Sequence, residues 1–208
     1  INKSDDPDAH FDKAFEQLHE QFGSAVCPVL VPYKDGKNVF FLNLIERKAY
    51  SFDAKGSRTT ADFDDKMEEL ASQYTDTLSE ALASTSEELL DKYFEEGEIS
   101  QEEAVEALHQ GIIDGSIVPV FSGSAVNLWG ITFLLDTIAD SFPRPTAKKV
   151  EKIIDGDGFK DMPIDPDGEP AIFVFKTIAD PFVGKMSFFK VMSGTLTNDL
   201  TLKNNTTG

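Results

Sequence analysis

A short, continuously apolar segment at 117–121 constrains the fold more than any other feature of the sequence. Such a run is typical of a strand that is buried on both faces of a sheet. A turn of small residues, 122–125, follows it. Apolar residues then recur at helical spacing up to Pro143, at Ile131, Leu134, Leu135, Ile138 and Phe142. A buried strand, a turn and an amphipathic helix in this order predict the last unit of an α/β sheet.

The first part of the chain predicts one helix and one hairpin. Apolar residues recur in steps of three and four over 11–22, with Asp8 placed to cap the start of this helix and Gly23 to end it. Two β-rich runs, 25–33 and 39–45, are separated by a turn sequence and are interpreted as a hairpin.

A long segment, 62–110, has the pattern of three helices. Thr85–Glu88 and Ser100–Glu103 both have the spacing of a capping box, which marks the start of a helix. Gly97 separates the second helix from the third, and Gly111 is expected to end the third.

The net charge of the chain is -18, and most of the excess acid lies in this helical segment. The simplest interpretation is a solvated surface; the alternative is a face that docks on a basic protein partner. Because an acidic chain repels phosphate at long range, no independent binding of nucleic acid is expected.

The composition changes again after the α/β pattern. Residues 144–170 are rich in Gly, Pro, Asp and Lys, as in a linker. The runs 171–178 and 185–192 are β-rich, with turn residues between and after them. They predict the opening of an all-β module that is too short to close a barrel.

Nothing in the sequence suggests a membrane or an oxidising compartment. No run approaches the length of a membrane span, and no signal peptide is visible at the N-terminus. Cys27 is the one cysteine, so no internal disulfide and no four-cysteine zinc site are possible. A cytoplasmic location is therefore expected. The missing Met and the abrupt start suggest that the chain was cut from a longer protein.

The tetrapeptide Asn2-Lys3-Ser4-Asp5 has the pattern Asn-Lys-x-Asp, which suits recognition of a guanine base. Guanine presents two donors on one edge, and an ionised Asp5 offers two oxygens that can accept both. Adenine would leave that carboxylate unpaired, which a built hydrogen-bonding site penalises heavily. The stem of Lys3 can lie along the base, and Asn2 can either bond the base edge or tie neighbouring loops together. The alternative is an Asp-rich helix start that favours the helix dipole.

Ser124 and Ala125 are the second candidate feature because they lie between a strand and a helix. In nucleotide-binding α/β folds, ligands sit at the carboxyl ends of strands. Small residues there let a backbone N–H approach the guanine O6 atom, and here that N–H belongs to Ala125. A plain turn is the alternative. The predicted guanine site thus consists of Asn2, Lys3, Asp5, Ser124 and Ala125, with no catalytic residue and no metal ligand.

Taken together, these features resemble the translational GTPases, and elongation factor G in particular. Asn2–Asp5 is similar to the fourth guanine-nucleotide motif of GTPases, and Ser124–Ala125 to the fifth. Their wide separation matches elongation factor G, in which a subdomain is inserted between the two motifs. The runs 111–125 and 176–196 are also similar to that family. Val126–Gly130 departs from the Lys-bearing stretch that is usual there.

The resemblance implies an α/β, P-loop NTPase-like G domain, here represented by its C-terminal part at 1–23 and 111–143. Residues 24–110 would be an inserted α+β subdomain. Residues 144–169 would be a linker, and 170–208 the truncated start of an all-β barrel, domain II.

The resemblance also implies a ribosome-bound factor that uses GTP hydrolysis to drive translocation of tRNA and mRNA. The full-length protein would bind GTP or GDP with Mg²⁺, and its inserted acidic subdomain would meet the ribosomal stalk protein. The sequence lacks a Gly-x-x-x-x-Gly-Lys-Ser/Thr phosphate cradle and switch regions ahead of the guanine motifs. The chain alone is therefore expected to be inactive and to hold nucleotide weakly at best.

Two alternatives remain at this stage. Within the family, the chain could belong to a ribosomal protection protein or a peptide-release GTPase. Outside it, the chain could be a non-enzymatic acidic interaction module in which the guanine motifs are coincidental. The strand, turn and helix around Ser124–Ala125 favour the GTPase.

Overall fold

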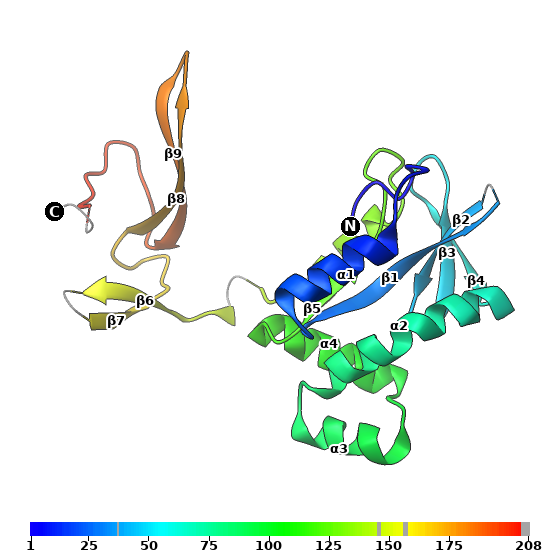
Figure 1. The fold of residues 1–208 in the computed structure, drawn as a ribbon. Helices are drawn as coiled ribbons and strands as arrows, with labels where there is room; N and C mark the ends of the chain where they lie inside the picture. Colours follow the sequence, from blue (N-terminus) through cyan, green and yellow to red (C-terminus); the bar gives the residue numbers. More distant parts are fainter. Residues whose placement is uncertain (37, 145–146, 156–157, 205–208) are drawn as a thin grey trace. The chain divides into compact units, whose positions relative to one another are not determined.

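The computed structural model describes residues 1–36, 38–144, 147–155 and 158–204. The chain forms two compact units, Ile1–Pro143 and Arg144–Gly208 (Figure 1). Each unit has its own sheets, and each is described by itself below.

The first unit is built on one five-stranded sheet with the strand order β4-β3-β2-β1-β5. The strands are β1 (Val26–Asp35), β2 (Asn38–Asn43), β3 (Lys48–Phe52), β4 (Arg58–Asp62) and β5 (Val118–Phe121). Strands β1 to β4 pair antiparallel in chain order, whereas β5 pairs parallel with β1. The predicted hairpin over 25–33 and 39–45 is confirmed by the pairing of β1 with β2.

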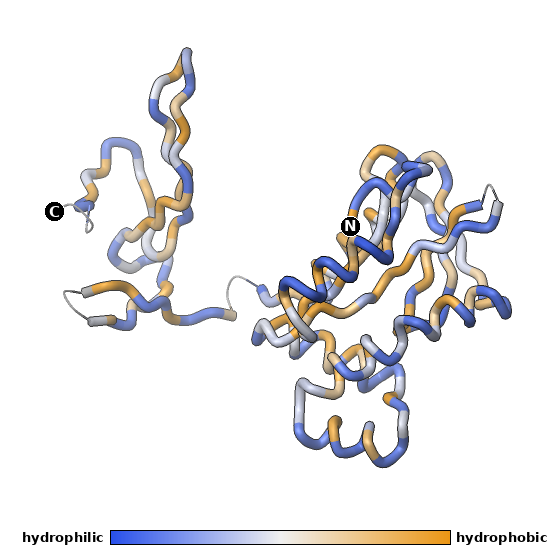
Figure 2. The backbone as a smooth tube through the Cα atoms, viewed as in Figure 1, coloured by the Kyte–Doolittle hydropathy of each residue, from blue (hydrophilic) through white to orange (hydrophobic). Residues whose placement is uncertain are grey.

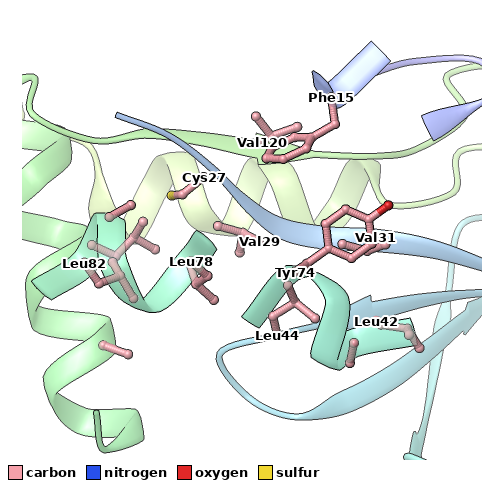
Figure 3. Close-up of a cluster of buried hydrophobic side chains, with 14 of the residues drawn as sticks. Phe15, Cys27, Val29, Val31, Leu42, Leu44, Tyr74, Leu78, Leu82 and Val120 are labelled. Atoms are coloured by element: carbon pink, nitrogen blue, oxygen red, sulfur yellow. The ribbon is translucent and has the colours of Figure 1, made fainter. Parts of the chain in front are cut away.

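One face of this sheet packs against α1 (Phe11–Phe22), α2 (Asp65–Ala83) and α4 (Gln101–Asp114). Cys27, Val29 and Val31 alternate along β1 and belong to the core on this face. Figure 3 shows these side chains meeting Phe15 of α1 and the apolar stripe of α2. The stripe residues in this core were expected from their helical spacing and include Met67, Tyr74, Leu78 and Leu82.

A smaller core contains the buried side chains Leu30, Phe41, Tyr50 and Phe133. Leu30 lies between two β1 residues of the larger core, so the alternation along the strand places it on the opposite face. Phe133 comes from α5 (Ile131–Ser141). The Phe41 ring is fully buried, and its centroid lies 5.5 Å from that of Phe52 and 6.4 Å from that of Trp129. This core therefore holds both α5 and the loop before it against the sheet.

Two of the predicted signals locate ends of the acidic helices correctly. α3 (Glu87–Glu96) ends at Gly97 in a left-handed conformation, which a glycine adopts without strain. Ser100 and Glu103 form the predicted capping box at the start of α4. The prediction of three helices between 62 and 110 is confirmed by α2, α3 and α4.

Two predicted caps are wrong. The residue before α1 is His10, which makes no capping hydrogen bond with its side chain, whereas Asp8 lies in a preceding turn where its N–H donates to Asp6. The cap of α3 is Ser86, whose hydroxyl accepts from the Leu89 N–H, so the helix begins one residue later than a Thr85 cap would allow.

The predicted end of the third acidic helix at Gly111 is also wrong, because α4 continues to Asp114 and is ended by Gly115. Gly111 is needed inside the helix for packing. A Cβ atom there would lie 2.2 Å from the Ile117 Cγ1 atom, so the absent side chain lets the returning chain pass close to the helix.

The junction between α3 and α4 is expected to depend on the charge of Glu103. Its carboxylate accepts from Lys92 Nζ at 2.7 Å and from the Ser100 N–H at 3.0 Å. The hydrogen bond from Lys92, followed by those from Ser100, lowers the pKa of Glu103 to about 2. A carboxyl whose pKa is lowered by folding stabilises the fold above its ordinary pKa and loses this contribution as the pH falls through the folded value.

We therefore expect stability against urea to fall as the pH is lowered from 4.5 to about 2, and Glu103→Gln to weaken this dependence. Unfolding is followed by far-ultraviolet circular dichroism at a series of pH values. Glu102→Gln, which removes a carboxylate from the same turn of α4, is the matched control. If both variants keep the full pH dependence, Glu103 does not carry it.

The prediction that 117–121 is a strand buried on both faces is wrong. β5 is the last strand of the sheet in the described part of the chain, and its Val118 side chain is 48% exposed. The following helix, α5, buries Phe133 but leaves Leu135 and Ile138 exposed. Figure 2 shows a hydrophobic stretch along β1, whereas hydrophobic and hydrophilic residues alternate along α1 and α2.

The second unit contains two separate antiparallel pairs among its described residues. They are β6 (Val150–Asp155) with β7 (Gly158–Pro163), and β8 (Ala171–Asp180) with β9 (Gly184–Ser193). The predicted β-rich runs at 171–178 and 185–192 are confirmed by β8 and β9. The linker predicted over 144–169 is wrong in its central part, because Val150 pairs with Pro163 in the β6–β7 ladder.

The described residues thus form a mixed α/β fold with sheets and helices, and no closed barrel is present among them. Within the same residues, no helix combines the length and the apolar character that crossing a membrane requires.

Candidate functional site

The N-terminal segment lies directly beside the loop that leaves β5. The Ile1 backbone nitrogen donates to the Phe121 carbonyl at 2.6 Å, and the Gly123 N–H donates to the Ile1 carbonyl at 3.1 Å. The Ser4 N–H donates to the Gly123 carbonyl at 3.0 Å. The two sequence motifs, more than a hundred positions apart, therefore meet at the carboxyl end of β5.

A compact loop, Ser124–Gly130, follows this junction and connects it to α5. Ser124 is fully buried, and its N–H donates to the Trp129 carbonyl at 2.9 Å across an isolated antiparallel bridge. The Ser124 hydroxyl accepts from the Asn127 N–H at 3.1 Å. Ser124 thus closes the 124–130 loop internally, while Ala125 beside it is exposed.

Asn2 ties the two motifs together through its side chain. Its Oδ1 atom accepts from the Ala125 N–H at 3.0 Å and from the Lys3 N–H at 2.7 Å. Of the two roles open to Asn2 from the sequence, the structure contains the tie between neighbouring loops. The Ala125 N–H, which the sequence assigns to a guanine O6 atom, is engaged by Asn2 here, so a ligand atom would have to share or displace this bond.

Lys3 and Asp5 lie on the exposed side of this junction. Lys3 has a φ of 69°, in the left-handed region, where a side chain other than glycine is strained and where functional loops often store such strain. Asp5 is exposed, and no described residue forms a hydrogen bond or an ion pair with its carboxylate. Both acceptor oxygens of Asp5 are therefore available to a ligand, as recognition of a base edge requires.

A shallow hollow of about 330 Å³ lies next to the N-terminal segment. Its lining includes Asn2, Lys3 and Ser4, the start of α1, and Pro32 and Lys34 of β1. Asp5, Ser124 and Ala125 do not line this hollow. The structure therefore brings Asn2 and Ala125 into contact and Ser4 against Gly123, but this hollow does not enclose the five predicted residues as one pocket.

No family model matches the chain. A crystal structure of a protein from Thermus thermophilus matches it with a TM-score of 0.62 and 25% sequence identity. The match covers 89% of this chain and 26% of the Thermus chain. The two proteins are structurally related. This chain spans about a quarter of the length of the Thermus protein.

Sequence reasoning missed three residues that shape the site, Ile1, Gly123 and Trp129. Ile1 supplies two backbone bonds to the strand end, and Gly123 makes room for the Trp129 carbonyl, which would lie 2.5 Å from a Cβ atom at position 123. The glycine within the small-residue turn was the only visible signal. Backbone contacts between distant segments leave no mark in residue type, so Ile1 and the carbonyl of Trp129 could not be found this way.

Proposed function

We propose that this chain is the guanine-recognising part of a translational GTPase similar to elongation factor G. The observation that carries the proposal is the junction of Asn2–Asp5 with Gly123–Ala125, held by the bond from the Ala125 N–H to Asn2 Oδ1 at 3.0 Å. Two motifs that match guanine recognition in sequence thus lie together at a strand end, where α/β folds bind nucleotides. The structural relationship to a much longer Thermus protein supports a larger parent.

In this proposal the specificity comes from Asp5. Its exposed carboxylate would accept from N1 and the 2-amino group of guanine at once, whereas adenine offers neither donor on that edge. Lys3, two residues before Asp5, has a strained left-handed backbone. In this proposal its long apolar stem would lie along the face of the guanine ring. Asn2 fixes the distance between this wall and the 124–130 loop.

The remaining machinery would be supplied by other parts of the parent protein. GTP and GDP are the proposed ligands of that protein, with Mg²⁺ at the phosphates, and the present sequence has no glycine-rich phosphate cradle to hold them. The parent is proposed to be cytoplasmic, to work on the ribosome and to drive translocation. Its stalk-protein contact is assigned to the acidic subdomain at 24–110, whose helix α3 carries Glu87 and Glu88 in its first turn.

The proposal is tested by Asp5→Asn in the full-length parent protein, with GDP and xanthosine diphosphate titrated separately. The amide side chain of this variant keeps one acceptor oxygen, but its NH2 group would face an N–H donor of guanine. A hydrogen bond to a charged group contributes about 1.5–3 kcal/mol, so we expect the affinity for GDP to fall about 10- to 100-fold. Xanthine carries an oxygen at position 2, so the preference for GDP over the xanthine nucleotide is expected to shrink or reverse.

Asp8→Asn is the matched control, because it removes an exposed carboxylate three residues away. It should leave both affinities unchanged. Unaltered GDP affinity and base preference in Asp5→Asn would defeat the guanine assignment and favour the acidic interaction module.

A further inference from the structure

The 124–130 loop is held on its outer side by a turn from the opposite end of the sheet. This turn, Asp53–Arg58, joins β3 to β4 and will be called the 53–58 turn. Gly56 at its tip is buried against Leu128, and a Cβ atom at position 56 would lie 3.0 Å from the Leu128 Cβ atom and 3.2 Å from its carbonyl oxygen. The turn therefore contacts the loop so closely that even the methyl group of an alanine at position 56 would crowd Leu128.

Both partners in this contact have left-handed backbones. Gly56 has a φ of 78°, which a glycine adopts readily, and Leu128 has a φ of 59°, which is strained for a leucine. Strained conformations of this kind persist only where their surroundings enforce them. The contact with Gly56 on one side, and the packing of the neighbouring Trp129 against Phe41 on the other, supply that enforcement.

The 53–58 turn is held together by internal hydrogen bonds. The Asp53 carboxylate accepts from the N–H groups of Lys55 at 2.8 Å and Ser57 at 2.9 Å, and the Gly56 N–H donates to the Asp53 carbonyl at 3.0 Å. At the end of the turn, Arg58 pairs with Asp136 of α5 at 3.4 Å. This exposed ion pair contributes little stability alone, but it ties the turn to the helix that follows the loop.

We propose that the 53–58 turn is a positioning element for the 124–130 loop, acting through the contact of Gly56 with Leu128. Leu128 is linked to the candidate site by one short path: its neighbour Trp129 accepts the Ser124 N–H, and Ala125 follows Ser124 and bonds Asn2. A displacement at the tip of the turn is thus transmitted to the backbone that faces the ligand. The part of this inference that concerns nucleotide affinity rests on the proposed function.

The first test measures the loop itself, without nucleotide. Hydrogen exchange is followed at the amides of Ser124, Ala125 and Asn127, all of which are bonded within the site. Gly56→Ala is expected to speed their exchange about 10-fold, because coupled sites of this kind change by roughly 0.5–2 kcal/mol. Gly36→Ala is the matched control: Gly36 has a φ of 61° and nothing within 4 Å of a Cβ atom, so it adds the same backbone strain without the contact.

A second variant separates positioning from general destabilisation. Leu128→Gly removes the side-chain atoms that an alanine at position 56 would meet, keeps the carbonyl oxygen at 3.2 Å, and suits the positive φ. Adding it to Gly56→Ala is therefore expected to restore most of the slow exchange at Ser124. If the two residues acted independently, the effects of Gly56→Ala and Leu128→Gly on the exchange rate of the Ser124 amide would add, and the double variant would exchange faster than either single variant. Equal exchange in Gly56→Ala and Gly36→Ala would overturn the proposal.

The third measurement is the GDP affinity of the full-length parent, where Gly56→Ala is expected to weaken binding about 3- to 30-fold and Gly36→Ala to have no effect. If the wild-type parent does not bind GDP while the exchange results hold, the proposed function fails and the positioning role stands. If GDP binds and Asp5→Asn weakens it but Gly56→Ala does not, positioning of the ligand-binding loop is overturned and the proposed function stands.

Discussion

Phe41→Ala is expected to lower the free energy of unfolding of the Ile1–Pro143 unit by about 3–5 kcal/mol, the usual loss for truncating a fully buried phenylalanine. The Phe41 ring is 0% exposed and packs edge-on against Phe52, with centroids 5.5 Å apart. The smaller core to which it belongs has only three other buried members among the described residues, so little of it can close over the cavity. Because whole domains are stable by about 5–15 kcal/mol, this loss is a large fraction of the total.

Urea denaturation followed by far-ultraviolet circular dichroism measures the effect. Phe94→Ala is the matched control, since the same truncation is made at a side chain that is 77% exposed on α3, and a change within about 0.5 kcal/mol is expected there. A loss in Phe41→Ala as small as that of the control would mean that the smaller core does not support the sheet. Fluorescence of Trp129 gives a second readout, because its ring faces Phe41.

The helices of the first unit could be predicted because their determinants are local. The stripe of α2 and the capping box at Ser100 and Glu103 depend on residues within one or two turns of each other. The same reasoning misses β4, whose residues are all exposed and show no alternation. It also misses the β6–β7 pair, because strands with many polar residues are defined by their partners rather than by their own pattern.

The sequence predicts which residues form the candidate site but only part of its geometry. The chemistry of Asp5 follows from its residue type, and its exposed carboxylate is consistent with that chemistry. The bond between Asn2 and Ala125 does not follow from sequence, because an asparagine in a loop can reach several partners. The contacts of Leu128 with Gly56 and of Trp129 with Phe41 do not follow from sequence either, because they join the 124–130 loop to distant parts of the sheet.

Gly123 is expected to be highly sensitive to an added side chain. Its backbone bonds to Ile1 on one side and Ser4 on the other, and a Cβ atom would lie 2.5 Å from the Trp129 carbonyl oxygen. That oxygen belongs to the backbone and accepts the Ser124 N–H at 2.9 Å, so it cannot rotate away as the end of a side chain could. Relief of the clash must therefore separate the N-terminal segment from the 124–130 loop or break the bridge that closes the loop.

Gly123→Val is accordingly expected to destabilise the first unit by about 3 kcal/mol, at the upper end of the cost of overpacking, and Gly123→Ala by about 1–3 kcal/mol. Gly97→Ala separates the clash from the general cost of replacing a glycine: Gly97 has a φ of 78° but nothing within 4 Å of a Cβ atom, so only the strain of about 1 kcal/mol applies. The three variants are compared by urea denaturation, together with exchange of the Ser124 amide. If Gly123→Val costs no more than Gly97→Ala and the Ser124 amide stays protected, the two motifs are not held by the close approach of Gly123 to Trp129.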